Sequence, residues 1–301
     1  MNAFRLLRKA WRHLAERRLE NDSFYRGSAR STVDAVFVIG CGRSGTTLLR
    51  AMLERHPQLW GGPESWLFIQ RVDPQIYAQK FDTTVDEAKL HLRNSRTAVE
   101  FAERYFGLCA SRAGKRRWVE KTPKHIHVLP YLMCSFPNAK FIHVVRDGRD
   151  VACSLRNHPK AAITRRGSVP IRSNNAISLC ISRWVRDTSA GLAYRDHPRL
   201  MTIRYERLAT SPEESLREVC CFLDEEFVPA MLVANPNQQE LKSRKSPSNS
   251  SSFEEITTNS LGRWRKDLSH EELLTCLRVG GPLLETLGYL TDATTAVPSE
   301  P

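Results

Sequence analysis

Short apolar runs alternate with amphipathic stretches through the middle of the chain. Residues 34–40, with the sequence DAVFVIG, form an apolar, β-rich run that ends in glycine. Residues 46–56, TTLLRAMLERH, follow with apolar side chains at helical spacing. The first pattern predicts a buried strand and the second an amphipathic helix. A strand, a glycine-rich turn and a helix in this order provide the setting that a phosphate-binding loop needs.

Three further segments predict strands, and helical stretches lie between them. The strands are expected at 117–123 (RWVEKTP, which runs into a proline turn), 140–145 (KFIHVV) and 200–205 (LMTIRY). Helices are expected at 84–112 as one or two elements, after the RDGRD segment, and at about 212–223. This alternation indicates an α/β fold, with a P-loop-like parallel β-sheet flanked by helices and carrying helical insertions.

The two ends of the chain differ in character from this α/β region. Residues 1–32 combine a very basic amphipathic helix with a polar linker, and residues 291–301 are expected to be a disordered tail. One domain is expected over 33–290. Within it, residues 238–259 are polar and serine-rich and predict a loop, and Ser269 is the expected N-cap of a last helix.

Charge and cysteine content limit the environment and the partners. The chain has 301 residues, a formal net charge of +12 and eight cysteines without a C-x-x-C pair. The charge favours anionic partners, and the cysteines are typical of buried free thiols in a reducing compartment. No signal-peptide core and no run of about 18 apolar residues is found, so a cytoplasmic protein is expected. The N-terminal helix either packs on the domain or binds anionic lipid at the inner membrane face.

The turn after the first predicted strand resembles a phosphate loop that lacks its lysine. In IGCGRSGTTLL, residues 39–49, Gly40 and Gly45 keep the common spacing and Thr47 stands at the Ser/Thr position. Thr46 occupies the lysine position, and Arg43 lies inside the loop. Backbone N–H groups at a helix N-terminus bind anions, and an arginine fork suits phosphate. The alternative is a plain glycine-rich turn.

A second anion site is expected after the strand at 140–145. Arg146 ends this strand, and Ser154 follows eight residues later on the next predicted helix. Ligands of α/β sheets bind at the carboxyl ends of strands, so the two side chains could hold one phosphate. The alternative is a charged turn with solvated arginines. The two sites together imply a ligand with two separate phosphate groups.

These segments resemble the sulfotransferases that use 3′-phosphoadenylyl sulfate (PAPS). VIGCGRSGTTLLRAML resembles their 5′-phosphosulfate loop, and VVRDGRDVACSL resembles their 3′-phosphate motif. The likeness continues through HPQLWGGPESWLF, WVEKTPKHI, IRYERL and LGRWRKDL, and so spans roughly residues 34–290. Within the superfamily the chain is most similar to bacterial enzymes of the tyrosylprotein sulfotransferase-like branch.

The resemblance implies a role for each matching residue. Those implied to hold the cofactor are Arg43, Ser44, Gly45, Thr46, Thr47, Arg146, Ser154, Tyr205, Arg263 and Ser248, the last in a covering loop. Lys121 would stabilise the leaving group, with Arg43 assisting, and Glu64 would be the general base of an in-line displacement. The transferring group carries less charge than a terminal phosphate, so no metal is called for.

The general base and the acceptor are left with alternatives. In the branch that acts on small molecules a histidine is the base, and His125 and His127 follow Lys121 closely. Without the resemblance, Glu64 would be read as a surface acid and these histidines as a solvated helix start. The family often has an arginine a few residues after the 3′-phosphate serine, where this chain has His158. The expected acceptor is a tyrosine in an acidic peptide, or else a sugar or lipid hydroxyl.

Two functions of other classes compete with sulfuryl transfer. A degenerate P-loop phosphotransferase would need Mg²⁺ and a strand that ends in an acid, whereas KFIHVV ends in Arg146. A non-enzymatic module that binds RNA or membrane would spread Lys and Arg over one face. The pairing of cations with a glycine loop favours the enzyme and argues against a nucleic-acid partner. Nothing in the sequence indicates an oligomeric state.

Overall fold

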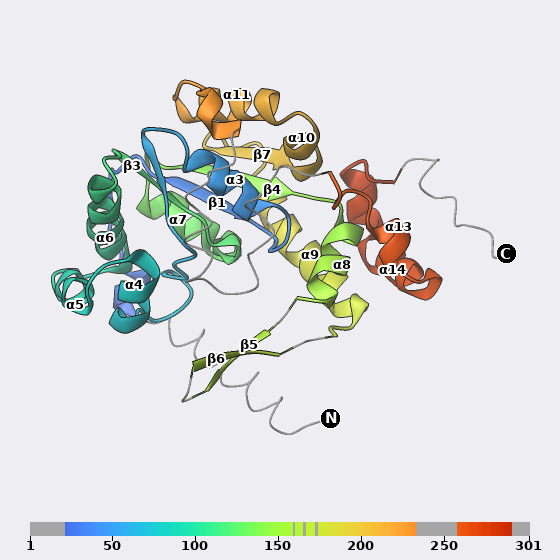
Figure 1. The fold of residues 1–301 in the computed structure, drawn as a ribbon, viewed down its shortest axis with the longest axis horizontal. Helices are drawn as coiled ribbons and strands as arrows, with labels where there is room; N and C mark the ends of the chain where they lie inside the picture. Colours follow the sequence, from blue (N-terminus) through green and yellow to red (C-terminus); the bar gives the residue numbers. More distant parts are fainter. Residues whose placement is uncertain (1–21, 159, 165–166, 172–173, 233–257, 291–301) are drawn as a thin grey trace.

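The computed structural model describes residues 22–158, 160–164, 167–171, 174–232 and 258–290. The expectations for the basic N-terminal helix, for Ser248 and for the tail therefore fall outside the described residues. A five-stranded sheet in the order β2-β3-β1-β4-β7 forms the centre of the molecule (Figure 1). Its strands are β1 (Val36–Gly40), β2 (Leu59–Gly61), β3 (Arg117–Glu120), β4 (Lys140–Val145) and β7 (Leu200–Arg204).

All four interfaces in this sheet are parallel, and β1 lies between β3 and β4. The chain leaves β1 toward one edge of the sheet and later returns to the other side of β1. The carboxyl ends beside β1 therefore form the switch point at which open α/β sheets bind ligands. The α/β fold and the four expected strands are confirmed. Strand β2 was not predicted, because three residues carry too little periodic signal.

Helices cover both faces of the sheet (Figure 1). They are α2 (Ser23–Arg26), α3 (Thr46–Leu53), α4 (Pro74–Phe81), α5 (Val85–Arg93), α6 (Ala98–Arg112), η1 (Pro123–Val128), α7 (Leu129–Ser135), α8 (Gly148–Arg156), α9 (Ile177–Leu192), α10 (Tyr205–Thr210), α11 (Pro212–Leu223), η2 (Pro229–Leu232), α13 (Trp264–Asp267) and α14 (His270–Thr286). The expected N-cap is present, since Ser269 forms a capping box with Glu272 at the start of α14. Helix α4 was missed, although Asp73 caps it and Pro74 begins it.

The sheet is buried on both faces because its residues alternate between two cores. Val36 and Val38 of β1 pack into a cluster with α3, α10 and α11. Phe37 and Ile39 point to the opposite cluster, which α6 and α7 complete. All five residues of β1 are buried, as expected for a central parallel strand. This rigid strand fixes the position of the loop that follows it.

Three other features of the fold bear on function. The segment that connects α8 to α9 contains an unpredicted antiparallel hairpin, β5 (Lys160–Thr164) and β6 (Gly167–Ile171). This hairpin stands apart from the main sheet (Figure 1). All eight cysteines are free, and six of them are buried, as the sequence predicted. No helix within the described residues is both long and apolar enough to cross a membrane.

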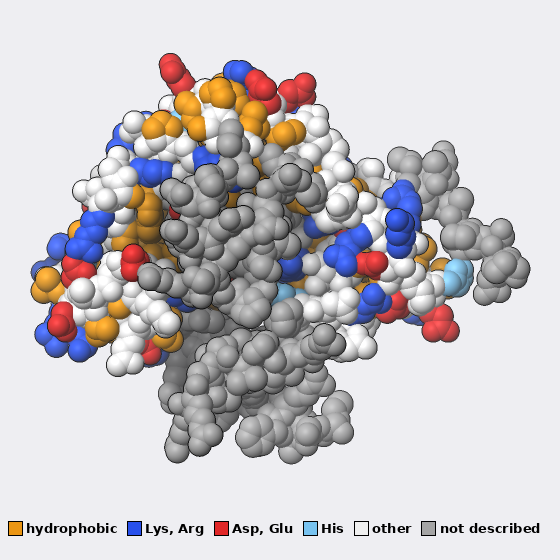
Figure 2. All heavy atoms as spheres, viewed as in Figure 1, with side chains coloured by type: hydrophobic (Ala, Val, Ile, Leu, Met, Phe, Trp, Pro, Cys, Tyr) orange, Lys and Arg blue, Asp and Glu red, His pale blue; other side chains and the backbone are white. Residues whose placement is uncertain are grey.

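Charged side chains of both signs are interspersed over the coloured part of the face in Figure 2. Exposed arginines such as Arg207 and Arg217 are paired with glutamates of α11. The described part of this face therefore does not present a single basic stripe.

Candidate active site

The carboxyl ends of all five strands lead into candidate residues. Strand β1 runs into the glycine loop with Arg43, β2 is followed by Glu64, and β3 by Lys121. Arg146 follows β4 directly, and Tyr205 follows β7. Since parallel strands end at the same edge, residues that are far apart in sequence meet at one edge of the sheet.

The loop after β1 needs backbone conformations that most residues avoid. Gly40 and Gly45 have φ values of 143° and 95°, and Arg43 has a φ of 75° although it carries a side chain. A Cβ on Gly45 would lie 2.2 Å from the ring of Tyr205. Glycine at 45 is thus required twice, by its dihedral angle and by the close approach of Tyr205. Helix α3 begins at Thr46, directly after this turn.

The two predicted anion motifs meet in space. Nε of Arg43 donates to Oγ of Ser154 at 3.0 Å, and Nη1 of Arg146 donates to the carbonyl of Arg43 at 3.4 Å. Burial lowers the pKa of Arg43, and the neighbouring Arg146 lowers it further. Two guanidinium groups that converge in a partly buried place need an anion between or beside them.

Two polar atoms at this place have no hydrogen-bond partner among the described residues. They are the buried Oγ of Ser44 in the loop and the buried Nε of Arg146. Buried polar groups are rarely left unpaired unless a ligand or water completes them. Both atoms therefore fit a site for phosphate groups.

A turn from the C-terminal part of the chain packs on Arg146. The Arg146 guanidinium lies 4.3 Å from the centre of the Tyr205 ring and donates to the carbonyl of Ser260. The Tyr205 hydroxyl and Ser260 Oγ are 2.7 Å apart. Asp150 holds this turn, because its carboxylate accepts the N–H groups of Gly262 at 2.9 Å and Trp264 at 3.0 Å.

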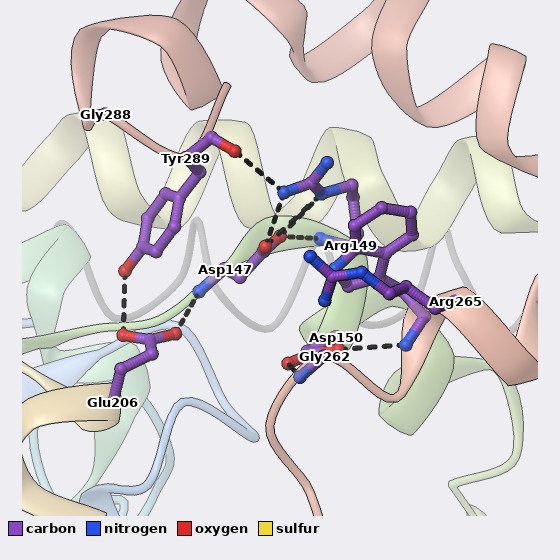
Figure 3. Close-up of a pocket in the computed structure, with 9 residues that line it drawn as sticks. Asp147, Arg149, Asp150, Glu206, Gly262, Arg265, Gly288 and Tyr289 are labelled. Atoms are coloured by element: carbon purple, nitrogen blue, oxygen red, sulfur yellow. Dashed lines mark hydrogen bonds and ion pairs between the residues drawn. The ribbon is translucent and has the colours of Figure 1, made fainter. Parts of the chain in front are cut away.

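A cavity of about 240 Å³ lies behind this turn (Figure 3). Arg149 binds Asp147 at 2.8 Å and the carbonyl of Tyr289 at 2.8 Å. Glu206 accepts the Tyr289 hydroxyl and the N–H of Asp147, at 3.0 and 2.9 Å. The residues that line the cavity thus pair with one another, and these contacts stabilise the segment that follows Arg146.

Glu64 and Lys121 form an ion pair at the other side of the loop. Nζ of Lys121 donates to Oε1 of Glu64 at 2.7 Å and to Oγ1 of Thr47 at 3.3 Å. The Lys121 side chain is only 3% exposed, whereas that of Glu64 is 30% exposed. Burial lowers the pKa of Lys121, and the Glu64 carboxylate opposes part of that shift. A carboxylate open to solvent thus lies beside a buried ammonium group that also touches the phosphate loop.

His125 and His127, the alternatives for the general base, each contact a buried carboxylate. His125 is fully buried, and its Nδ1 lies 2.8 Å from Oε2 of Glu120, so the expectation of a solvated helix start is wrong for it. Nε2 of His127 lies 2.8 Å from Oδ1 of the buried Asp187. His158 has its pKa lowered by burial and by the positive charges of Arg43 and Arg183.

Helix α9 also contributes a residue next to the glycine loop, and the sequence did not predict this contact. Asp187 accepts Nε of Arg183 at 3.3 Å and Nε of Arg186 at 3.0 Å, beside its contact with His127. A Cβ on Gly42 would lie 2.9 Å from Nη2 of Arg183. Arg183 is therefore a further cation at the loop.

Arg263 lies near enough to Arg43 for its positive charge to lower the pKa of Arg43. Its guanidinium pairs with Asp267 at 2.6 Å, and its side chain is 35% exposed. Ser260, three residues earlier, makes the contacts with Arg146 and Tyr205 instead. The predicted polar loop ended at residue 259, and nothing in the sequence singled out Ser260.

Comparison with known proteins places the chain in a family. A model of the sulfotransferase family matches residues 35–229. The chain is 30% identical to nodulation protein NoeE of Sinorhizobium fredii, over 84% of this chain and 65% of that protein. It is 26% identical to the protein-tyrosine sulfotransferase of Drosophila melanogaster, over 91% of this chain and 55% of that protein. The chain thus spans less than two thirds of the length of either relative.

A solved structure supports the fold. The sulfotransferase domain of the olefin synthase of Synechococcus PCC 7002 superimposes with a TM-score of 0.64 and 23% identity. The match covers 88% of this chain and 98% of that domain. The family model, the similar relatives and the shared fold agree, and the protein belongs to the sulfotransferase family.

Proposed function

We propose that this chain transfers a sulfuryl group from PAPS to an acceptor hydroxyl. The observation that carries the proposal is the meeting of two anion motifs through the contacts of Arg43 with Ser154 and Arg146. A ligand held there needs two separate phosphate groups, and PAPS carries them at its 5′ and 3′ positions. The unpartnered Oγ of Ser44 and Nε of Arg146 are donors that fit these groups.

The cofactor-binding residues divide into two sets. Those proposed for the 5′-phosphosulfate are Arg43, Ser44, Gly45, Thr46 and Thr47. Those proposed for the 3′-phosphate are Arg146 and Ser154. Tyr205, the first residue of α10, and Ser260, in the turn that packs on Arg146, support the second set. Ser248 and Arg263 remain proposals from the resemblance, and Ser248 lies outside the described residues.

Glu64 is the proposed general base, and Lys121 the proposed partner of the leaving group. PAPS supplies an activated sulfuryl group, and the acceptor oxygen forms a bond to sulfur while the bond from sulfur to the 5′-phosphate oxygen breaks. The acceptor proton passes to the Glu64 carboxylate, which is accessible, and the contact of Lys121 with Thr47 places its charge beside the loop. The burial of His125 argues against that residue as the base.

The structure weakens the phosphotransferase alternative. Strand β3, next to β1, does end in a carboxylate, Glu120. That carboxylate is surrounded by donors from Ser65, Thr122 and His125, so its oxygens are not available to a metal.

The acceptor is proposed to be a tyrosine in an acidic peptide. The net charge of +12 and the likeness to a protein-tyrosine sulfotransferase support this choice. A sugar or lipid hydroxyl is the alternative. Contact of the N-terminal helix with a membrane stays a prediction from the sequence.

A transfer assay tests the proposed function. Purified protein is incubated with PAPS labelled in its sulfuryl group and with cell extract, and the labelled product is identified by mass spectrometry. We expect label on a hydroxyl of a peptide, sugar or lipid, and at least 100-fold slower labelling with Glu64→Ala. Labelling that needs Mg²⁺ and ATP, or that persists without the protein, would contradict the proposal.

A further inference from the structure

We infer that Glu120 is the positioning residue that fixes both Glu64 and Lys121 in the geometry of the reaction. This inference rests on the proposed function of the same site. Glu120 ends strand β3, and its side chain is 2% exposed, so it cannot touch the acceptor itself. It acts through the two residues next to the reacting groups.

The Glu120 carboxylate receives five hydrogen bonds. Ser65 donates its N–H at 3.3 Å and its hydroxyl at 2.7 Å. Thr122 donates its N–H at 3.0 Å and its hydroxyl at 2.6 Å. Nδ1 of His125 lies 2.8 Å from the second carboxylate oxygen and supplies the fifth. Hydrogen bonds to a buried ionised acceptor are among the strongest in proteins.

These donors stand directly beside the reacting residues. Ser65 follows Glu64 in the chain, and Thr122 follows Lys121. The two segments come from the ends of different strands, 57 residues apart, and the Glu120 carboxylate joins them. The distance of 2.7 Å between Glu64 and Lys121 therefore depends on one buried group beneath them.

The same network holds a strained residue in place. Trp66 has a φ of 60°, which is rare for a bulky side chain, and its N–H donates to Oγ1 of Thr122 at 3.2 Å. Such a conformation is unfavourable and persists only where the surroundings enforce it. The strain lies two residues after Glu64, so loss of the network releases the segment that carries the proposed base.

The negative charge of Glu120 suits this role. Burial alone would raise its pKa, but the nearby His125 and the hydrogen bonds of Thr122 and Ser65 outweigh burial and bring the pKa to about 2. A carboxylate accepts at both oxygens, whereas an amide of the same shape turns one acceptor into a donor. That amide would face donors and leave them unpaired, at a cost typical of broken buried networks.

His125 completes the network from the far side. Its ring meets Phe68 edge-on, with centroids 5.3 Å apart, and its contact with Glu120 is buried. His125 therefore orients Glu120 and accepts no proton from the acceptor.

The test compares Glu120→Gln with Glu225→Gln. Glu225 is a matched control, because its carboxylate is 5% exposed and pairs with Arg117 at the opposite end of the same strand. With wild-type transfer as reference, we expect Glu120→Gln to lower kcat about 100-fold, the cost of a misplacement near 1 Å. Affinity for adenosine 3′,5′-bisphosphate should stay within threefold, and Glu225→Gln should leave kcat within threefold.

A double-mutant cycle separates positioning from general loss of structure. If Glu120 acts through Glu64, then Glu120→Gln in a Glu64→Ala background should cost less than tenfold. Equal losses in both backgrounds, or equal losses in Glu120→Gln and Glu225→Gln, would overturn the inference. If Glu120→Gln fails to fold, Ser65→Ala and Thr122→Val provide a second test, because each removes one hydroxyl that donates to Glu120. Each of these two variants should lower kcat at least tenfold. Thr122→Ser keeps the hydroxyl and should restore kcat.

A chemical readout is independent of turnover. Lys121 is buried and ion-paired, so amine-modifying reagents should label it slowly in the wild-type protein, as mass spectrometry can measure. We expect faster labelling of Lys121 in Glu120→Gln and no change in Glu225→Gln. This result would stand even if the wild-type protein did not use PAPS, and unchanged labelling in Glu120→Gln would contradict the inference.

Discussion

Nζ of Lys121 lies 2.7 Å from Oε1 of Glu64 and also contacts Thr47 in the glycine loop. One buried ammonium thus joins the proposed base to the proposed sulfate site. It also supplies the cation that the loop lacks at the position of Thr46.

Loss of the Glu64 carboxylate should stop transfer without affecting cofactor binding. Glu64→Gln keeps the side-chain shape but cannot take a proton, so kcat should fall about 10²–10⁴-fold. Affinity for adenosine 3′,5′-bisphosphate, measured by calorimetry, should be unchanged. An active Glu64→Gln together with a dead but folded His125→Ala would instead make the histidine the base.

Removal of the Arg43 guanidinium should abolish cofactor binding. Arg43 contacts Ser154 and lies inside the loop, so Arg43→Ala removes a charge from the meeting point of both motifs. We expect the affinity for adenosine 3′,5′-bisphosphate to fall at least 100-fold. Arg217→Ala, at an exposed pair with Glu213, is the control and should bind normally. Normal binding by Arg43→Ala would argue against the loop as the cofactor site.

Asp150 should raise the affinity for adenosine 3′,5′-bisphosphate, although its negative charge repels a phosphate. Asp150→Asn replaces one acceptor with a donor, so it loosens the turn held through Gly262 and Trp264. Because that turn places Ser260 on Arg146, affinity for adenosine 3′,5′-bisphosphate should fall about tenfold. Equal or tighter binding would show that the turn opposes the ligand instead of holding its site ready.

His143 should make the protein sensitive to acid. Burial against Gly191 lowers the pKa of His143 to about 4, while the unfolded chain has the ordinary value of 6.5. The unfolded state therefore binds the proton first, so stability is full above about pH 6.5 and falls as the pH drops toward 4. At pH 5 this histidine alone should cost about 2 kcal/mol.

His143→Phe provides the check on this pH dependence. Both ring nitrogens of His143 have no hydrogen-bond partner among the described residues, so their removal breaks no hydrogen bond there. Urea unfolding of both proteins at pH 7 and pH 5 should show a smaller loss at pH 5 for the variant. The same loss in both proteins would assign the acid sensitivity to other groups.

The local features of the site were predictable from the sequence, because each lies within a few residues of its signal. The glycine loop, the strand before Arg146 and the cap at Ser269 all follow from short patterns of apolar, glycine and polar residues. The roles of Glu64 and Lys121 came only from the resemblance. Their contact joins segments 57 residues apart, and no spacing rule covers such a distance.

Other parts of the site depend on tertiary packing and had no local signal. Glu120 reads as an ordinary strand residue, yet its five donors come from three places in the chain. Arg43 and Trp66 adopt positive φ values that propensity assigns to glycine or asparagine. Strand β2 is too short to be predicted from the sequence, although it positions Glu64.

The most direct test of the account compares adenosine 3′,5′-bisphosphate with adenosine 5′-monophosphate by calorimetry. The two ligands differ only in the phosphate assigned to Arg146 and Ser154. We predict that the wild-type protein prefers the bisphosphate at least 100-fold, without added Mg²⁺, and that Arg146→Ala reduces this preference to threefold or less. Equal binding of both ligands, tighter binding of ATP with Mg²⁺, or a preference that survives in Arg146→Ala would contradict the account.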